Sequence, residues 1–456
     1  MPSSLRKVLN DLPTSLDDTY ERTLQGIPKE QWQHAHRLFQ CMVVAIRPLR
    51  VEELAEIFAV EFDSYTVPNL VEEWRPDNAE EAVLSACSTL IAVVEDNGSK
   101  YFQFSHFSVK EFLTSNRLRT SDVGDICQYH ISLDSAHIIL AQACLAVLLQ
   151  LDKTMDKTRL ASFPLAFYAA HHWVDHAKLN VLITQIQDAM ERLFDPTKSY
   201  LASWAWIYDV DRSWVRLPLE SLPDHPPKLG ASALYYAVLC GFSQLAKHLI
   251  VAHVQDVNTK CGYHGTPLHA ALFTKHLDAA SVLLDHGADV SLGDRDGRIP
   301  LVRAYDCRNL EAMRLLLEHG ATPDVRYGSF GFLSHHASHH GRTEVMRLLL
   351  DHEADLNARC SKAWTPLHWA SAGGHTDVAR ILLEYGADVD AQSKTGNTPL
   401  HQASQNGHVD VVQVLLEHGA DLHVRGEYDW TPFQMATSMG HSEVAQLLLN
   451  YGAEEE

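Results

Sequence analysis

Cysteine patterns that would form disulfides or bind metals are missing from this chain. Its 456 residues contain eight cysteines, which is too few for a disulfide scaffold, and no two of them form a C-x-x-C pair. The sequence therefore gives no starting point for a thioredoxin-like or a zinc-ribbon site. Long apolar runs are also missing. The most apolar one, Ile138–Leu151, is too short to span a bilayer and predicts a buried helix.

Positive charge is scarce. The chain has 37 Lys and Arg against 58 Asp and Glu, which gives a net charge of -21. Such a chain is a poor non-specific binder of nucleic acid or of anionic membranes. The N-terminal segment has no apolar core of the signal-peptide type, so we expect a cytoplasmic protein with reduced thiols. The 46% hydrophobic and 21% charged residues are typical of a globular protein with two or three domains.

Catalytic and phosphate-binding motifs are absent as well. The sequence has no G-x-x-x-x-G-K-[ST], G-x-S-x-G, H-E-x-x-H or G-x-G-x-x-G. These motifs would supply, in turn, a phosphate cradle, a serine nucleophile, a zinc site and a dinucleotide-binding turn. We therefore predict a protein that is not an enzyme and that holds no cofactor.

An internal repeat is the strongest positive signal. The pattern T-P-L-H-x-A occurs at Thr266, Thr365 and Thr398, with degenerate copies near 232, 299, 332 and 431. Thr can cap a helix, and Pro suits the first turn of one. A second, amphipathic helix follows, and Gly386 and Gly419 stand where helices end in a left-handed residue. Each helix pair leaves an apolar flank exposed, so the units must stack.

This pattern resembles the ankyrin repeat over residues 231–456, in seven units that start near 232, 266, 299, 332, 365, 398 and 431. The resemblance implies a solenoid whose concave face, made of loop tips and first helices, binds a protein partner. The positions that match this face are Tyr327, Phe330, Lys362, Trp364, Trp369, Lys394, Asn397, Gln402, Tyr428 and Trp430. Exposed aromatic residues make good anchors, so we favour Trp364, Trp369 and Trp430. Alternatively, Trp364 and Trp430 pack against neighbouring loops.

Two units depart from the repeat pattern. The unit at 332 has Glu353 where its neighbours have Gly, and the unit at 299 has Arg308 where later units have a Gly between the helices. A side chain in a left-handed conformation is costly, so we expect the middle of the array to be less stable than the 365–430 block. The ankyrin resemblance also implies structural hydrogen bonds between units for His269, His368 and His401.

Four histidines in S-H-H-A-S-H-H-G form a candidate metal pattern. His335 and His339, and likewise His336 and His340, are i,i+4 pairs, a spacing that can chelate Zn or Ni on a helix. No carboxylate or Cys at motif spacing completes a site, so we predict no metal centre. Two more histidines at this spacing, in F-Y-A-A-H-H-W-V-D-H-A, lie among aromatics, which favours core packing.

Residues 30–120 predict a different kind of domain. The expected elements are helices at Gln31–Ala45, Val51–Val60 and Ala79–Leu90, a hairpin that turns at Asn97-Gly98, and a last helix capped by Ser108. Three helices, a two-stranded wing and a further helix are typical of a winged-helix domain. Its third helix has two acids and no base, which argues against DNA binding.

The motif F-S-H-F-S-V-K-E-F-L, Phe104 to Leu113, is similar to a signature of winged-helix domains in NACHT-type signalling NTPases. These belong to the STAND class, which includes NLR receptors. The segments Leu9–Leu24 and Phe163–Ala177 look like parts of fungal NACHT–ankyrin proteins. In that family the winged-helix histidine touches the phosphate of bound ADP, and the matching residue here is His106. That family is also catalogued beside a GPI inositol-deacylase, but a lipase would need the nucleophile elbow that this sequence lacks.

Taken together, the sequence predicts a mainly α fold in four parts. These are a post-NACHT connecting segment (1–29), a winged-helix domain with a β-hairpin wing (30–120), a helical spacer (121–230) and an ankyrin-repeat solenoid (231–456). The first hypothesis is a non-enzymatic interaction scaffold in NACHT-type signalling or recognition. The second is a regulatory fragment of a nucleotide-dependent STAND switch, whose NTPase domain is missing or acts in trans.

Overall fold

The computed structural model describes residues 15–62, 67–87, 89–96, 98–121, 125–178, 186–212 and 221–454. The chain divides into two compact units, Met1–Ala270 and Ala271–Glu456, which are described in turn. Helices dominate both units, and the strands of the described residues occur only as two-stranded antiparallel pairs. The predicted mainly α fold is therefore confirmed.

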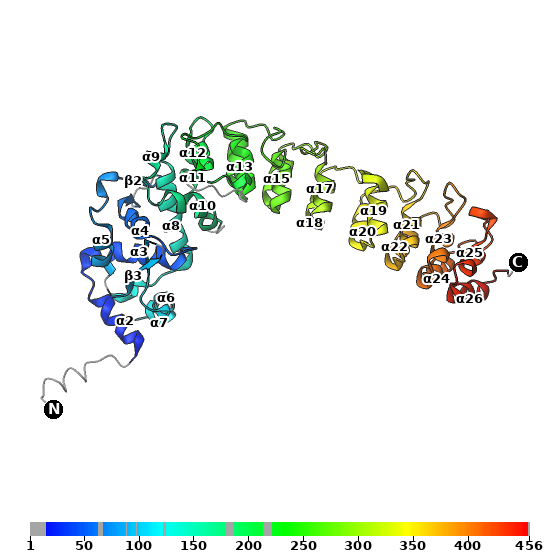
Figure 1. Ribbon diagram of the computed structural model, residues 1–456, viewed down its shortest axis with the longest axis horizontal. Coiled ribbons are helices and arrows are strands. Elements are labelled where there is room, and N and C mark those ends of the chain that lie inside the picture. Colours follow the sequence, from blue (N-terminus) through cyan, green and yellow to red (C-terminus); the bar gives the residue numbers. More distant parts are fainter. Residues whose placement is uncertain are drawn as a thin grey trace, which may run out of the picture. The chain divides into compact units, whose positions relative to one another are not determined.

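The first unit begins with a winged-helix arrangement (Figure 1). Its elements are α2 (Leu16–Gln25), α3 (Trp32–Val44), α4 (Val51–Glu56), β1 (Val60–Glu61), β2 (Asn69–Leu70), α5 (Ala79–Cys87), β3 (Ile91–Asp96), β4 (Ser99–Phe104), α6 (Phe107–Leu113) and α7 (Asn116–Arg119). Strands β3 and β4 form the predicted wing, with Ile91 opposite Phe104 and Asp96 opposite Ser99. The turn residue Asn97 lies outside the described residues.

Three predicted helix boundaries in this domain are wrong. The helix expected over Val51–Val60 ends at Glu56, because Val60 enters β1 and pairs with Leu70. The third helix ends three residues before Leu90, whose carbonyl oxygen instead accepts a hydrogen bond from a backbone N–H at the end of the wing. The last helix is capped by His106 rather than Ser108, because the His106 backbone is extended and its Nδ1 accepts the Ser108 N–H.

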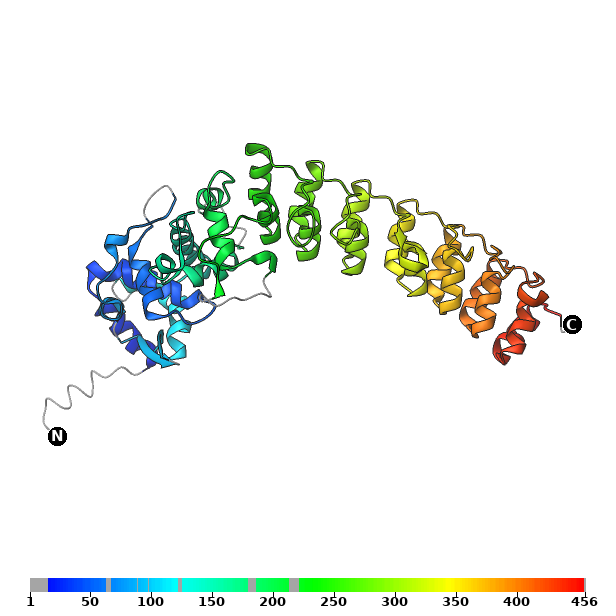
Figure 2. The same ribbon diagram turned by 45° about the horizontal axis from the view of Figure 1, so that its top comes forward.

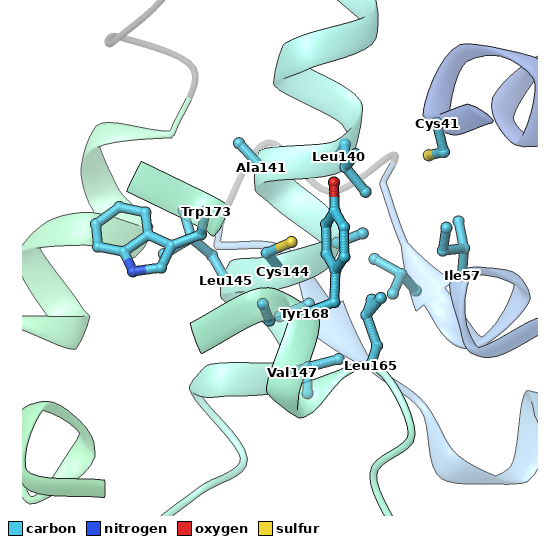
Figure 3. Close-up of a cluster of buried hydrophobic side chains, with 14 of the residues drawn as sticks. Cys41, Ile57, Leu140, Ala141, Cys144, Leu145, Val147, Leu165, Tyr168 and Trp173 are labelled. Atoms are coloured by element: carbon cyan, nitrogen blue, oxygen red, sulfur yellow. The ribbon is translucent and has the colours of Figure 1, made fainter. Parts of the chain in front are cut away.

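Five further helices add buried side chains to the core of the first unit. They are α8 (Leu133–Leu148), α9 (Lys157–Leu160), α10 (Ala166–Ala177), α11 (Gln187–Leu193) and α12 (Tyr200–Ile207). Helix α8 packs against α3 and α10, and Figure 3 shows Tyr168 of α10 beside Cys144 and Leu140 of α8. Tyr168 and Trp173 are fully buried. The apolar run that forms α8 is thus a core helix, and no helix in the described ranges is long and apolar enough to cross a membrane.

Seven helix pairs follow at the predicted repeat starts. They are α13 (Ala233–Cys240) with α14 (Ser243–Ala252), α15 (Pro267–Thr274) with α16 (Leu277–Asp285), α17 (Pro300–Asp306) with α18 (Leu310–Glu318), α19 (Leu333–His339) with α20 (Thr343–Asp351), α21 (Pro366–Gly373) with α22 (Thr376–Glu384), α23 (Pro399–Asn406) with α24 (Val409–Glu417), and α25 (Pro432–Ser438) with α26 (Ser442–Asn450). The first pair lies in the first compact unit, since the units divide within α15.

The helices of the second unit form two rows (Figures 1 and 2). In the inner row, α21 packs against α19 and α23, and α23 packs against α25. In the outer row, α18, α20, α22, α24 and α26 pack in succession. We call the loops 325–331, 358–364, 391–397 and 424–430, each of which precedes an inner helix, the fingers. In the finger 325–331, β5 (Arg326–Tyr327) pairs with β6 (Gly331–Phe332).

The predicted departures from the repeat have the expected backbone conformations. Gly386 ends its unit at a φ of 92°, which glycine adopts at little cost. Glu353 takes the corresponding position at a φ of 65°, and Arg308 has a φ of 53°. Each such side chain costs about 1 kcal/mol. Lower stability in the middle of the array follows from this strain and stays a prediction.

Candidate protein-binding surface

His368 and His401 form the predicted hydrogen bonds between repeats, whereas the one expected for His269 stays a prediction. His368 accepts the Thr365 N–H at Nδ1 (3.2 Å), and its Nε2 donates to a carbonyl of the next finger (3.0 Å). His401 repeats this bridge to the next finger at 3.0 Å, and His335 repeats it at 2.9 Å although its unit lacks the Thr-Pro. His269, which lies in the first compact unit, is hydrogen-bonded to Thr266 of its own repeat. Burial lowers the pKa of His368 to about 4, so the ring is neutral at pH 7.

One of the two candidate metal-binding pairs includes His335, which occupies the structural histidine position of its repeat. Both nitrogens of His335 are engaged with backbone groups, so the predicted 335/339 pair does not exist as a chelate. His336 is hydrogen-bonded to the Tyr305 hydroxyl (2.6 Å) and stacks on His340. Burial and the neighbouring His340 lower the pKa of His336 to about 4. Across the ranges that the structure describes, no three His, Cys, Asp or Glu side chains lie close enough together to hold a metal ion.

Aromatic side chains from three successive repeats meet in one continuous row. Ring centroids are 4.5 Å apart between Tyr327 and His336, 4.9 Å between His336 and Phe330, 5.2 Å between Phe330 and Trp369, and 4.7 Å between Trp369 and Trp364. Offset and edge contacts of this kind hold rings in fixed orientations. We call this row the aromatic strip; its members are Tyr305, Tyr327, Phe330, His336, His339, His340, Trp364 and Trp369.

Cationic side chains border the aromatic strip. The Lys362 Nζ lies over the rings of Trp364 (5.3 Å) and Trp369 (6.0 Å). At the other end, the Arg342 guanidinium lies 4.0 Å from the centroid of the Tyr305 ring. The Lys394 side chain is exposed on the neighbouring finger. Its backbone N–H donates a hydrogen bond to the Lys362 carbonyl. Contacts between a cation and an aromatic face are favourable and are common at binding surfaces.

The backbone between Lys362 and Trp364 is strained. Ala363 has a φ of 57°, a left-handed conformation that Gly396 adopts in the following finger. The Trp369 indole N–H is also buried, with no acceptor within the part of the chain that the structure describes. Strained residues and unsatisfied polar groups cost free energy and tend to be kept where they serve a function. Both features lie at the Trp364–Trp369 end of the aromatic strip.

Two of the predicted contact residues are wrong. Asn397 and Gln402 are only 3% and 4% exposed, so neither is open to a partner. The Asn397 Oδ1 accepts the Glu427 N–H (2.8 Å) and thereby ties adjacent fingers together. Gln402 lies on α23, which is covered on both sides by α21 and α25. Asn397 and Gln402 therefore take part in packing between neighbouring repeats.

Trp430 and Tyr428 form a separate aromatic pair on the last finger. Their ring centroids are 5.8 Å apart, and the Trp430 carbonyl accepts the bond from His401. Tyr428 is 76% exposed at a φ of 62°. Of the three favoured tryptophans, the structure brings Trp364 and Trp369 together, and their rings pack on neighbouring side chains while staying half exposed.

Sequence reasoning missed two members of this surface, His336 and Arg342, and the buried Tyr305 ring that both of them contact. His336 stands at the same repeat position as Trp369, so aligning the units could have identified it. Next to these residues, an open cavity of about 720 Å³ lies between residues 297–306, which include α17, and residues 325–328. The Tyr327 hydroxyl donates to Asp306 (2.7 Å) at its wall. The Tyr327 end of the aromatic strip therefore borders this cavity.

His106, the residue at the NACHT-type position, is exposed at the start of α6. Its Nδ1 lies 2.6 Å from the Ser108 hydroxyl, which in turn is 2.8 Å from the Tyr20 hydroxyl. Through this chain the His106 ring caps α6 and connects it to α2. A structural role for His106 is therefore visible in the geometry.

Comparison with protein families identifies both halves of the chain. Residues 334–383, 367–416 and 406–449 match ankyrin repeats (many copies), and residues 223–327 match ankyrin repeats (3 copies). Residues 20–124 match the winged helix domain of GPI inositol-deacylase. Ankyrin repeats generally mediate protein binding, and both kinds of domain are typically non-catalytic.

Among curated proteins, the chain is 29% identical over 296 residues to the azaphilone pigments biosynthesis cluster protein L of Monascus ruber, which covers 62% of this chain and 61% of that protein. It is 40% identical over 72 residues to the inactive serine/threonine-protein kinase TEX14 of Bos taurus, covering 16% of this chain and 5% of that protein. The chain spans less than two thirds of the length of each relative. It therefore combines a winged-helix domain of the GPI inositol-deacylase type with a C-terminal array of ankyrin repeats, and such an array supports a protein-interaction role.

Proposed function

We propose that the chain is a non-enzymatic scaffold and that the aromatic strip of the second unit holds a protein partner. The observation that carries this proposal is the unbroken row of ring contacts from Tyr305 to Trp364, which crosses three repeats. Half-exposed aromatic side chains are the usual anchors of protein interfaces.

The rigidity of the strip supports the same function. Trp369 and His336 stand on helices of the inner row, and the fingers that carry Tyr327 and Trp364 are pinned by backbone hydrogen bonds. A surface that is already ordered loses little conformational entropy when a partner binds. The fingers and inner helices therefore provide a preorganised surface.

A selection experiment tests this placement. The full chain is immobilised and exposed to a phage-displayed library of random 16-residue peptides, and enriched peptides are measured against the Trp364→Ala/Trp369→Ala variant. We expect that variant to bind them at least about 30-fold more weakly, since loss of an interface anchor costs about 2 kcal/mol or more.

The matched control is Tyr385→Ala, which removes an exposed aromatic at the end of outer helix α22. It should leave peptide binding within about twofold of the wild type, because surface changes away from a binding site have small effects. Equal binding to the double tryptophan variant, or a selection without any peptide that depends on these residues, contradicts the proposal.

We also propose that this scaffold works in a cytoplasmic NACHT-type signalling or recognition pathway. The F-S-H-F-S-V-K-E-F-L motif and the winged-helix match over residues 20–124 support this context. A second candidate function is that of a regulatory fragment of a nucleotide-dependent switch, with an NTPase domain supplied in trans. The exposed position of His106 favours it, because a ring at the surface is open to a separate domain.

The switch candidate predicts an association that depends on ADP. A purified NACHT NTPase domain should bind the full chain more tightly with ADP than without it, and His106→Ala should remove that difference. Calorimetry measures both affinities. Glu111→Gln, an exposed change on the same helix, serves as the control. Binding that ignores ADP, or that survives the loss of His106 unchanged, eliminates this candidate.

A further inference from the structure

Charge is segregated within the fourth to sixth repeats. The stretches 325–342, 358–375 and 391–408, which contain the fingers and the inner helices, have no Asp or Glu and five bases: Arg326, Arg342, Arg359, Lys362 and Lys394. The intervening stretches 343–357, 376–390 and 409–424, which contain the outer helices, have eleven Asp or Glu and only Arg347 and Arg380. In a chain with a net charge of -21, the fingers and inner helices of these repeats thus form a face to which they contribute bases and no acid.

The bases of this face are open to a partner. Arg326, Arg359, Lys362 and Lys394 are exposed, and Arg342 is half buried. Lys362 lies over the strip tryptophans, and Lys394 follows on the next finger. Basic residues therefore lie at both ends of the aromatic strip. The surface combines apolar anchors with positive charge beside them.

Acids next to these stretches are already engaged by the protein. The Asp324 carboxylate accepts the Asp355 N–H (3.1 Å), and Asp390 accepts the corresponding N–H of the next unit (3.0 Å). Asp306 accepts hydrogen bonds from Tyr327 and Arg298. These three carboxylates are thus engaged in hydrogen bonds within the array, whereas the Lys362 and Lys394 side chains are exposed.

We infer that the partner segment held by the aromatic strip is acidic, with at least one aromatic or large apolar side chain. This inference rests on the proposed function and specifies its partner. An acidic segment gains attraction from five bases on the near side, and the acids of the outer row lie on the opposite side of each helix pair. Charge complementarity of this type raises association rates and rejects partners of the wrong charge.

Nucleic acid fits this surface less well than an acidic polypeptide. The strip rings meet one another in tilted and edge-on contacts at 4.5 to 5.2 Å, whereas successive bases stack best on a series of parallel ring faces. The eleven acids of the outer stretches also oppose a long polyanion that extends beyond the five bases. A short acidic peptide avoids this repulsion.

The test uses the peptides selected on the full chain. We expect enriched peptides to be net negative and to contain an aromatic or large apolar residue. Their affinity should fall about tenfold in Lys362→Glu/Lys394→Glu, because each reversal removes an attraction and adds a repulsion. The control Arg347→Glu/Arg380→Glu makes the same change in net charge on exposed outer-row residues and should alter binding less than threefold, roughly the effect of long-range charge alone.

The outcomes separate this inference from the proposed function. Enriched peptides of neutral or positive charge that still need Trp364 and Trp369 would overturn the acidic partner and leave the binding surface in place. Equal effects of the two charge-reversal variants would also overturn it. If a 20-nucleotide single-stranded DNA competes with the peptides at equal or lower concentration, the face suits a polyanion rather than an acidic polypeptide, and the inference fails.

Discussion

Replacing Glu53 by Gln is expected to lower the free energy of unfolding of the winged-helix domain by about 3 kcal/mol. The Glu53 side chain is fully buried, and its carboxylate accepts two bonds from the Arg47 guanidinium (both 2.7 Å), one from Arg50 Nε (2.9 Å) and one from the Arg50 N–H (2.8 Å). Breaking a buried ion pair costs about 3–5 kcal/mol. The lower end applies because both guanidinium groups remain in contact with water.

The pH dependence of this effect has a definite sign. Burial alone would raise the pKa of Glu53, but the bonds from Arg47 and Arg50 outweigh it and lower the pKa below 4.5. A carboxylate with a lowered pKa stabilises the fold above the pKa of the unfolded chain, and this contribution is lost as the pH falls through the lowered value. The difference between wild type and Glu53→Gln should therefore be constant near pH 7 and shrink below about pH 4.5.

Hydrogen exchange of peptides that cover α4 measures this difference, because it reports the local free energy of opening. Glu52→Gln is the matched control, since Glu52 is the exposed neighbour on the same helix. Its effect should stay within about 0.5 kcal/mol. If both variants open with the same free energy, the Arg47–Glu53–Arg50 contacts do not stabilise the domain as the geometry implies.

The repeat period predicted the array well because each unit carries its own local signals. Thr365 and Pro366 start a helix, and Gly386 ends the unit, so the helix pairs appear where the pattern places them. The slot histidines were predicted for the same reason, since His368 and His401 occupy equivalent positions. Period and local chemistry agree in most repeats, with exceptions such as Arg308 and Glu353. Such agreement makes a prediction from sequence reliable.

The contact surface was harder to predict because a repeat position does not say how a side chain is used. Asn397 and Trp364 both stand just before a repeat start, yet Asn397 bridges two fingers while Trp364 joins the aromatic strip. His335 and His336 are adjacent in sequence, but one fills the buried slot and the other faces Tyr305. Such differences depend on side-chain contacts between repeats, which the position within a repeat specifies only in part.

Acid should destabilise the ankyrin array well above the pH at which carboxylates protonate. Burial lowers the pKa of His368 to about 4 and also lowers those of His335 and His401. The unfolded chain binds these protons near pH 6.5, so stability is complete above that value and falls as the pH drops toward 4. Between pH 7 and pH 5, His368 alone should cost about 2 kcal/mol, and the other two act in the same direction.

Hydrogen exchange of peptides from α21 and α23, corrected for the intrinsic effect of pH, measures this loss as a decrease in the free energy of local opening. The last repeat suggests the matched variant, because Gln434 fills the slot there, with its Oε1 accepting the Thr431 N–H (3.0 Å). His368→Gln should keep this bond to its own threonine and should cost less than about 1.5 kcal/mol at pH 7.

On acidification, His368→Gln should lose about 2 kcal/mol less stability than the wild type, because its slot no longer takes up a proton. His336, whose pKa is also about 4, is present in both proteins, so its contribution cancels in the comparison. An equal loss in wild type and variant would place the acid sensitivity elsewhere. A smaller loss in the variant would show that the bond from His368 to the next finger makes the packing of these repeats depend on pH. The order of the fingers that carry the aromatic strip would then depend on pH as well.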